Sequence, residues 1–381
     1  MRLKSVLCDT KGRGAHRLPL LGVLSLVLAS CASVFDAEPD CRMGVALNFV
    51  YDYHMEPGAD AFASNVDCVT VLVFDAETGA FVKQLTETTE VLEDPGYRME
   101  LLLDTGSYHL VVYGGLACED ARFDLTPEFP VTRSGEMRKE DILVSLPSED
   151  GVSKTQLHNI EERWGGLFYG TKDIVLTDQD LSVQFREETV YLMKDTNNIQ
   201  VILQELSYPY QIDYRNYDIK IIDDNFVLDG YNNVVPTAAD GIQPVYMPYA
   251  SENRIMGFVE PGERNGQAVE EDEDRPVQVA CVEFSTSRLF LEHIETAKLV
   301  VTSKTEVDTN GDPLQIINIP LIKYLTAIRG FGDSWIKDDQ EFLDRQSRWT
   351  LMFFLQHDVW MSARVSVNWW TVRINDIELD Y

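Results

Sequence analysis

The feature that most constrains the fold is a two-residue period of apolar side chains that recurs along much of the chain. Val45, Leu47 and Phe49 alternate with other residues, which is typical of a strand with one face in a core. Turn-forming sequences follow such segments at short intervals, as at residues 75–79 and 104–106. This spacing predicts short antiparallel strands, and we expect them to form β-sandwiches.

The second half of the chain resumes this pattern after a break. We expect a second sandwich domain over residues 187–381, following a first one over residues 45–186, so the predicted fold class is all-β with a minor helical part. Within residues 320–345 the apolar period lengthens, which predicts one or two short helices. Residues 229–275 are rich in Gly, Pro and Asn and contain a run of five acids, so we expect mostly loop there.

The last predicted strand lies close to the C-terminus, and its apolar phase differs from that of the segment before it. A slip of one residue is what a β-bulge or a crossing between sheets produces. Because main-chain pairing needs no particular side chains, such a strand could pair with another protein chain. The alternative is an internal closing strand. The candidate strand-exchange segment comprises Asn368, Trp370, Val372, Ile374, Ile377 and Leu379.

The N-terminal region predicts export and lipidation. An apolar run at residues 18–30 follows five basic residues and is shorter than the roughly 20 residues that span a bilayer. Residues 1–30 therefore read as a cleaved signal peptide. Leu28–Ala29–Ser30–Cys31 matches the lipobox of bacterial lipoproteins, so we expect fatty acyl chains such as palmitate on Cys31 and a tether over residues 31–44. The alternative is an ordinary signal with a coincidental cysteine.

Charge and motif content narrow the function further. The chain has 32 basic and 63 acidic residues; without residues 1–30 it has 27 and 62, a net charge of −35. Nucleic acid is therefore a poor partner. No His-Glu-x-x-His, Gly-x-Ser-x-Gly or phosphate-binding Gly-Lys-Ser/Thr motif is present, so no enzyme, cofactor or metal is expected.

Two patterns that could bind ligands have simpler explanations. Asp308, Asn310 and Asp312 have the spacing of a calcium loop. However, Pro313 stands where such a loop needs glycine and Ile319 where it needs glutamate, so a hairpin turn is expected. Tryptophans near the C-terminus could offer a sugar-stacking platform, but apolar strands favour core or interface positions for them. They are Trp335, Trp349, Trp360, Trp369 and Trp370.

Four cysteines follow Cys31, and an exported chain can form disulfides. Cys41 and Cys118 flank strands of the first domain, and a bond between them is our prediction. Closing a loop of this length would stabilise the fold by roughly 4 kcal/mol in the chain-entropy model. Pairing of either cysteine with Cys68, or reduced thiols throughout, is left open; a buried free thiol would suit Cys68. The role of Cys281 is not indicated.

The sequence also carries a family resemblance, spread over eight segments. They are residues 47–53, 66–70, 97–101, 113–118, 194–201, 283–289, 340–346 and 370–379. Together, and in this order, they resemble the FimB/Mfa2 family of Bacteroidales fimbrial anchor lipoproteins. The resemblance implies two transthyretin-like sandwiches in series, lipidation at Cys31 and a place at the outer-membrane base of a fimbria.

This resemblance directs the functional hypothesis. It implies a non-enzymatic protein that holds a fimbria to the outer membrane and the cell surface, with fimbrial shaft subunits and outer-membrane lipid as its partners. We expect the first shaft subunit to join by strand complementation. The alternative is a surface glycan-binding lipoprotein, because a sandwich with rows of aromatic residues and a lipid anchor would serve that role too.

Overall fold

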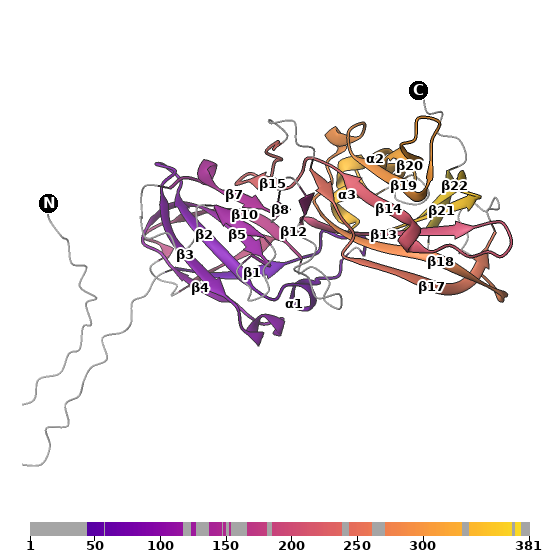
Figure 1. Cartoon of the computed structure of the whole chain (residues 1–381). Coiled ribbons are helices and arrows are strands. Elements are labelled where there is room, and N and C mark those ends of the chain that lie inside the picture. The colour runs from indigo at the N-terminus through magenta and orange to yellow at the C-terminus, as the bar shows by residue number, and fades with distance from the viewer. Residues whose placement is uncertain are drawn as a thin grey trace, which may run out of the picture. The chain divides into compact units, whose positions relative to one another are not determined.

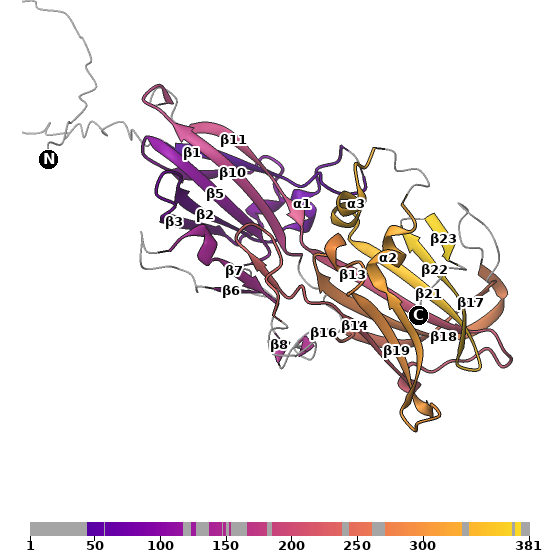
Figure 2. The ribbon, with the colours of Figure 1, turned by 90° about the horizontal axis from the view of Figure 1, so that it is seen from above.

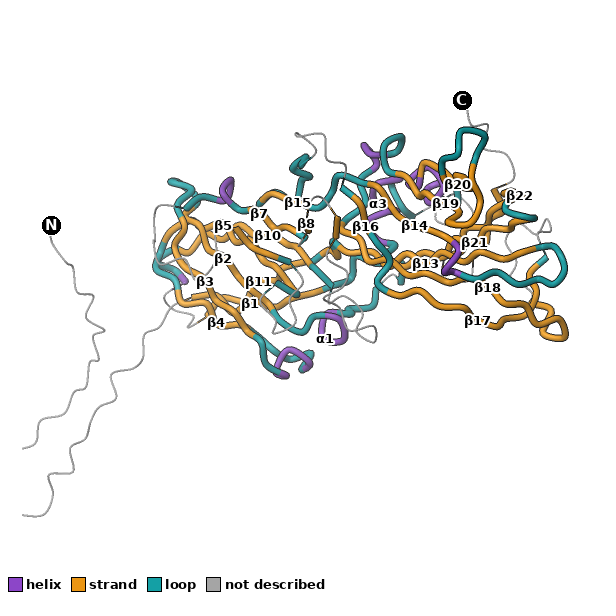
Figure 3. Tube along the Cα trace, in the orientation of Figure 1, coloured by secondary structure: helices purple, strands orange, loops and turns teal. Residues whose placement is uncertain are grey.

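The structure is a computed structural model. It describes residues 44–56, 58–116, 123–126, 137–146, 148–149, 152–153, 166–180, 185–237, 244–260, 271–329, 335–367 and 370–374. The chain after residue 41 clusters into one compact unit. Strands dominate its described part (Figures 1 and 3), which confirms the all-β class with few helices. None of the helices in that part is long and apolar enough to cross a bilayer.

The first sandwich packs a three-stranded sheet against a five-stranded one. In the smaller sheet, β1 (Gly44–Val50) is antiparallel to β4 (Met99–Leu102) and parallel to β11 (Phe185–Tyr191). Alternate residues of β1, such as Leu47 and Phe49, lie in the core between the sheets, as the two-residue period predicts. The larger sheet has the order β12-β10-β5-β2-β3. Its strands are β2 (Val69–Asp75), β3 (Phe81–Glu87), β5 (Gly106–Gly114), β10 (Phe168–Leu176) and β12 (Met193–Lys194).

The end of β5 shows a local requirement for glycine. Gly115 has a φ of +80°, and a Cβ atom there would lie 1.9 Å from the carbonyl oxygen of Gly166. Its N–H donates to the carbonyl oxygen of Cys68 at 3.0 Å. Only glycine tolerates both this backbone angle and this close approach, so glycine at position 115 has a structural reason.

The second sandwich contains two six-stranded sheets. The first has the order β17-β18-β13-β21-β22-β23, and its central strand β13 is antiparallel to β18 and parallel to β21 (Figure 2). Its strands are β13 (Thr196–Glu205), β17 (Ala250–Val259), β18 (Glu271–Ser287), β21 (Arg348–Gln356), β22 (Val359–Val367) and β23 (Trp370–Ile374).

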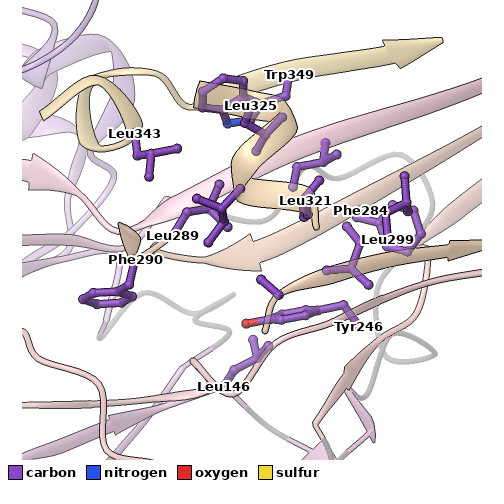
Figure 4. Packing of buried hydrophobic residues seen from close by; sticks show 14 of the residues in the cluster. Leu146, Tyr246, Phe284, Leu289, Phe290, Leu299, Leu321, Leu325, Leu343 and Trp349 are labelled. Atoms are coloured by element: carbon purple, nitrogen blue, oxygen red, sulfur yellow. The ribbon is translucent and has the colours of Figure 1, made fainter. Parts of the chain in front are cut away.

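The other six-stranded sheet has the order β20-β19-β14-β16-β9-β8. Buried side chains of both sheets share one hydrophobic core, in which Figure 4 shows Phe284, Leu299 and Trp349. A small sheet, β15-β7-β6, lines the same core. The remaining strands are β6 (Asp124–Thr126), β7 (Leu143–Ser145), β8 (Ser148–Glu149), β9 (Val152–Ser153), β14 (Tyr217–Ile222), β15 (Val227–Asp229), β16 (Val245–Tyr246), β19 (Lys298–Val307) and β20 (Pro313–Pro320).

Short helices lie where the apolar period lengthens. α2 (Leu321–Thr326) and α3 (Asp339–Arg345) confirm the helices predicted within residues 320–345. The side chain of Asp338 caps α3 by accepting a hydrogen bond from the N–H of Glu341 at 2.9 Å. The other helical segments are α1 (Phe62–Asn65) and the 3₁₀ turns Glu90–Glu93, Lys139–Asp141, Tyr214–Asn216 and Leu291–His293.

The prediction that residues 229–275 are mostly loop is wrong. β16 and β17 lie within it, and β18 begins at Glu271, inside the run of acids. β17 is an edge strand that obtains its main-chain hydrogen bonds from β18. Such a strand can carry solvent-facing charges, and Glu252 and Arg254 are exposed in it, so it lacks the apolar alternation that reveals other strands.

The connection between the sandwiches follows β11. The predicted domain limit, between residues 186 and 187, falls inside β11, which still pairs with β1. The short strand β12 pairs with β10 of the first sandwich, and a single residue separates β12 from β13 of the second. Asp195 is that connecting residue, and the limits 45–186 and 187–381 stay a prediction.

Candidate functional site: a sheet edge and a polar junction

The candidate strand-exchange segment lies at the edge of the C-terminal sheet. β23 pairs antiparallel with β22, and Val372 and Ile374 stand opposite Val365 and Ala363 in the ladder. Both β22 residues are fully buried. On its other side β23 pairs with none of the described strands. Trp370 begins the strand, while Asn368, Ile377 and Leu379 lie outside the described residues.

The phase change before this segment has a different cause from the one expected. β22 ends at Val367 and β23 starts at Trp370, running antiparallel to β22 in the same sheet. The apolar phase therefore changes because the chain reverses direction. The described strands lie in one sheet and run in opposite directions, so the expected β-bulge or crossing between sheets is corrected.

From this edge a ladder of strands leads to the centre of the sheet. β22 pairs with β21, and β21 pairs with β13, whose first residues follow the connection from the first sandwich. Trp349 of β21 donates from its indole nitrogen to the side-chain oxygen of Asn197 on β13 at 3.1 Å. The ring of Phe342 on α3 meets Trp349 edge-on at 5.6 Å between centroids. These contacts fix α3 against the start of β13.

The connecting residue Asp195 is a fully buried acid. Its N–H donates to the carbonyl oxygen of Leu167 at 2.7 Å, and its Oδ1 accepts from the amide nitrogen of Asn232 at 3.0 Å. Oδ2 has no hydrogen-bond partner among the described residues. Burial raises the pKa of Asp195 to about 7, although the nearby charge of Arg288 and the bond from Asn232 oppose this shift.

Arg288 ties the second sandwich together beside Asp195. Its guanidinium makes two bonds to the carboxylate of Asp344 on α3, at 2.8 and 2.9 Å, and a third to the carbonyl oxygen of Asn232 at 3.0 Å. The guanidinium also lies 4.8 Å from the ring centroid of Phe290. Asp344 is 8% exposed, so this bidentate pair is almost withdrawn from water.

Arg345, the last residue of α3, contacts the loop after β1. Its guanidinium lies 4.0 Å from the ring centroid of Tyr53 and donates to the carbonyl oxygen of His54 at 3.4 Å. Glu341 accepts from Nε of Arg345 at 2.7 Å, one helical turn earlier. Together with Asp195, these bonds form a polar junction, defined here as Asp195, Asn232, Arg288, Asp344 and Arg345. Sequence reasoning offered only one hint of it, because three of the resembling segments contain four of these residues.

The predicted covalent sites fall mostly outside the described residues. Cys31, Cys41 and Cys118 all lie there, so lipidation and the Cys41–Cys118 bond stay predictions. Cys68 is disulfide-bonded, which corrects the idea of a free thiol at this position. Its partner is not among the described cysteines. Cys281 is a buried free thiol on β18, and burial raises its pKa to about 11.

The patterns that could bind ligands resolve into structural features. Asp308 Oδ1 accepts from the N–H groups of Asn310 and Asp312, at 2.8 and 3.0 Å, in the turn between β19 and β20. This is the expected hairpin turn. Trp349 is buried and Trp335 is 43% exposed, so these two tryptophans do not share one open platform. The side chains of Trp369 and Trp370 lie outside the described part.

Comparison with known proteins gives the family. The profile of the family described as fimbrillin-A associated anchor proteins Mfa1 and Mfa2 matches residues 38–376. The chain belongs to this family. The resemblance seen in the sequence is thereby confirmed. No curated protein matches the chain.

Three solved structures show how far the similarity extends. A candidate adhesin from Bacteroides thetaiotaomicron is 37% identical, with a TM-score of 0.69 over 87% of this chain and 98% of that chain. A candidate polysaccharide-binding protein from the same species is 26% identical, with a TM-score of 0.65 over 88% and 100%. The fimbrial anchor protein Mfa2 from Porphyromonas gingivalis is 19% identical, with a TM-score of 0.58 over 87% and 99%, and shares the fold.

Within the described part of this Mfa2-family chain, no three His, Cys, Asp or Glu side chains gather as a metal site. One acid–base pair, a buried aspartate with a partly buried histidine, was missed by sequence reasoning. His293 Nδ1 lies 2.6 Å from Asp223 Oδ1, and hydrogen bonding to Asp223 raises the pKa of the imidazole although burial opposes it. The two residues are 70 positions apart, so no local motif marks them. The pair tethers the 3₁₀ turn at Leu291–His293 to the end of β14.

Proposed function

We propose that this protein is a lipid-anchored, non-enzymatic component of the outer membrane that holds a fimbria to the cell surface. The observation that carries the proposal is the match of the fimbrial anchor family to residues 38–376. The 37% identical adhesin candidate agrees with a role at the cell surface. In this proposal residues 1–30 are removed as a signal peptide, Cys31 carries the acyl chains, and residues 31–44 form the tether.

Shaft subunits are the proposed partners, and β23 is the proposed point of attachment. β23 pairs with β22 alone among the described strands, so its second edge offers main-chain N–H and C=O groups to an incoming strand. Main-chain pairing of this kind supplies affinity without a specific side-chain motif. Asn368 to Leu379 is accordingly the segment through which the first shaft subunit joins by strand complementation.

The anchoring role is tested by replacing the lipidated cysteine. In cells that carry Cys31→Ala, fimbriae should be shed into the medium, because no acyl chain holds the anchor protein in the membrane. Cys8→Ala, a cysteine change inside the proposed signal peptide, is the matched control and should keep fimbriae on the cells. Electron microscopy of cells and medium gives the measurement. Normal fimbriae on Cys31→Ala cells would refute the anchor function.

Surface glycan capture is a second candidate function. It is favoured by the 26% identical structure that is named as a candidate polysaccharide-binding protein, and by the partly exposed ring of Trp335. Calorimetric titration of the full chain with soluble polysaccharides separates the two functions. Saturable binding that disappears in Trp335→Ala would favour glycan capture. No heat of binding, together with shedding of fimbriae by Cys31→Ala, would favour the anchor.

A further inference from the structure

The tip of the β17–β18 hairpin is set apart from the rest of that hairpin. Gly257 pairs with Pro276, but the next residue, Phe258, pairs with Asp272, so residues 273–275 are left between two paired sections. Pro276 has no N–H to donate to the ladder. The short section at Phe258 and Val259 therefore depends less on the hairpin than on what it contacts across the sheet.

Gln204 of β13 holds this tip by its main chain. The fully buried Gln204 donates from Nε2 to the carbonyl oxygen of Val259 at 2.9 Å, and its Oε1 accepts from the N–H of Val259 at 3.1 Å. The amide side chain of Gln204 offers an N–H donor and a C=O acceptor, as the main chain of a neighbouring strand would. Gln204 thus binds an extended segment without reading the identity of its side chain.

Apolar residues below Gln204 receive the side chain of Val259. Val259 is fully buried and packs with Met352 and Phe354 of β21, on the face of the sheet opposite the main core. Ile202 and Leu206 complete this apolar pocket. The pocket fits an aliphatic side chain, and an acidic side chain there would be buried without a partner.

The residues on either side of Val259 are recognised by arginines. The guanidinium of Arg275 lies 3.8 Å from the ring centroid of Phe258, and its Nη1 lies 3.6 Å from the carboxylate of Glu260. Arg364 of β22 donates to the carbonyl oxygen of Glu260. Together with Gln204 and the apolar pocket, these arginines form a groove. This groove binds an extended main chain that carries an aromatic residue, an aliphatic residue and an acid in succession.

We propose that this groove, formed by the apolar pocket together with Gln204, Arg275 and Arg364, is a receptor for an extended aromatic–aliphatic–acidic segment of a fimbrial subunit. Phe258–Val259–Glu260 occupies it in cis and is displaced when the subunit binds. The identity of the partner rests on the proposed function. Its position supports the assignment, because Arg364 stands opposite Arg373 of β23 in the ladder, so the groove reaches the strand beside the proposed attachment edge.

The chemistry of the groove is tested with a fluorescently labelled peptide that copies residues 255–261. Binding to the full chain is measured by fluorescence anisotropy. Val259→Asp should expel the cis segment, because its carboxylate would enter an apolar pocket, and peptide affinity should rise at least tenfold. Combining it with Gln204→Met, which keeps the length of the side chain but removes both main-chain bonds, should cancel that gain. A peptide with aspartate in place of valine should not bind.

Glu260→Lys guards against loss of folding in Val259→Asp. The native Glu260 side chain is largely exposed, so the substitution should leave the protein folded. The new lysine places a cation beside Arg275, so the cis segment should loosen and peptide affinity should rise severalfold. Ile255→Lys, at a 69% exposed position on the same strand, is the matched control and should bind the peptide as the unaltered chain does. Folding is checked by circular dichroism. A folded Glu260→Lys protein with unaltered peptide affinity would overturn the proposal.

Two further outcomes separate this proposal from its alternatives. If the loosened variants form dimers in size-exclusion chromatography, the groove exchanges the segment between two copies, and the fimbrial partner is wrong. If the peptide binds as expected but Gln204→Met leaves capture of a purified shaft subunit unaltered, the partner is again wrong. The peptide titration needs no fimbria. Its result is therefore independent of whether Cys31→Ala sheds fimbriae, and failure of one proposal can be distinguished from failure of the other.

Discussion

The two edge strands of the C-terminal sheet are held in different ways. β17 pairs with β18 over ten residues, and its tip also contacts the side chains of Gln204 on β13 and Arg275 on β18. β23 pairs with β22 over five residues. An edge that exchanges strands must open at low cost, and the cost rises with the number of contacts that are lost. β23 is therefore the edge that can add a partner strand at low cost, whereas the tip of β17 can be displaced only by a segment that replaces its contacts with Gln204.

The two edges also differ in their route to the first sandwich. Force applied at β23 would pass through β22 and β21 to β13, and from β13 through Asp195 to the first sandwich. β17 reaches β13 through β18, from the opposite side. The polar junction lies where the first route leaves the sheet. Both routes leave the sheet through β13 and Asp195, so a protein that holds a fibre needs the polar junction to be strong.

Removal of β23 gives the largest expected effect. Deleting residues 368–381 should reduce capture of a shaft subunit below detection, because the deletion removes the edge to which the partner would pair. Ile255→Lys on the opposite edge should leave capture intact. Pull-down with a purified shaft subunit gives the measurement. Equal losses from both changes would end the distinction between the edges, and unaltered capture after the deletion would refute strand complementation at β23.

Much of the fold could be predicted because its determinants are local. The alternation at Val45, Leu47 and Phe49 indicated β1, and the Asp308 turn indicated the β19–β20 hairpin, since turn chemistry is a property of a few consecutive residues. β17 was missed for a physical reason. Its residues Glu252 and Arg254 face solvent at an edge, so the strand is defined by its pairing with β18 and not by its own pattern.

The polar junction could not be predicted from local sequence. Asp195 reads as an ordinary acid between two strands, and its burial depends on Asn232 and Arg288, which follow it far along the chain. The Arg288–Asp344 pair joins residues 56 positions apart. The state of Cys68 was misjudged for a similar reason, because a position on an apolar face of a strand does not distinguish a packed thiol from a disulfide.

Arg288→Ala should strongly weaken the junction. The change leaves the carboxylate of Asp344 buried without its bidentate partner, and breaking such a pair costs about 3–5 kcal/mol of unfolding free energy. Arg215→Ala is the matched control. Arg215 also pairs with an acid, Asp213, but its side chain is 71% exposed, so no measurable change is expected. Urea denaturation provides both values, and similar results for the two variants would show that the junction is no stronger than a surface pair.

Asp195→Asn should change how stability depends on pH. The pKa of Asp195 is raised to about 7 in the folded protein, so between about pH 4 and pH 7 the folded state holds a proton that the unfolded state has lost. The contribution of Asp195 to the free energy of unfolding is therefore fully present at low pH, and it falls by up to about 1.4 kcal/mol per pH unit as pH rises through this window.

Asparagine cannot ionise, so the stability of Asp195→Asn relative to the unaltered chain should increase from pH 5 to pH 7 and level off above it. Urea midpoints at pH 5, 6, 7 and 8 give the measurement. The charged groups nearest to this site, Arg288 and Asp344, are present in both proteins and cancel in the difference. Parallel stability profiles would mean that Asp195 keeps the same charge throughout the range.

Tyr169→Phe should give the smallest effect at the junction. Tyr169 on β10 donates from its hydroxyl to the carbonyl oxygen of the buried Gly230 at 3.0 Å, which joins the first sandwich to the turn after β15. Removing one such bond while keeping the ring should cost about 1 kcal/mol. Tyr208→Phe, at an 85% exposed position, should cost nothing measurable. If Tyr169→Phe lowers the free energy of unfolding as much as Arg288→Ala does, single neutral hydrogen bonds contribute as much to the connection between the sandwiches as the buried ion pair does.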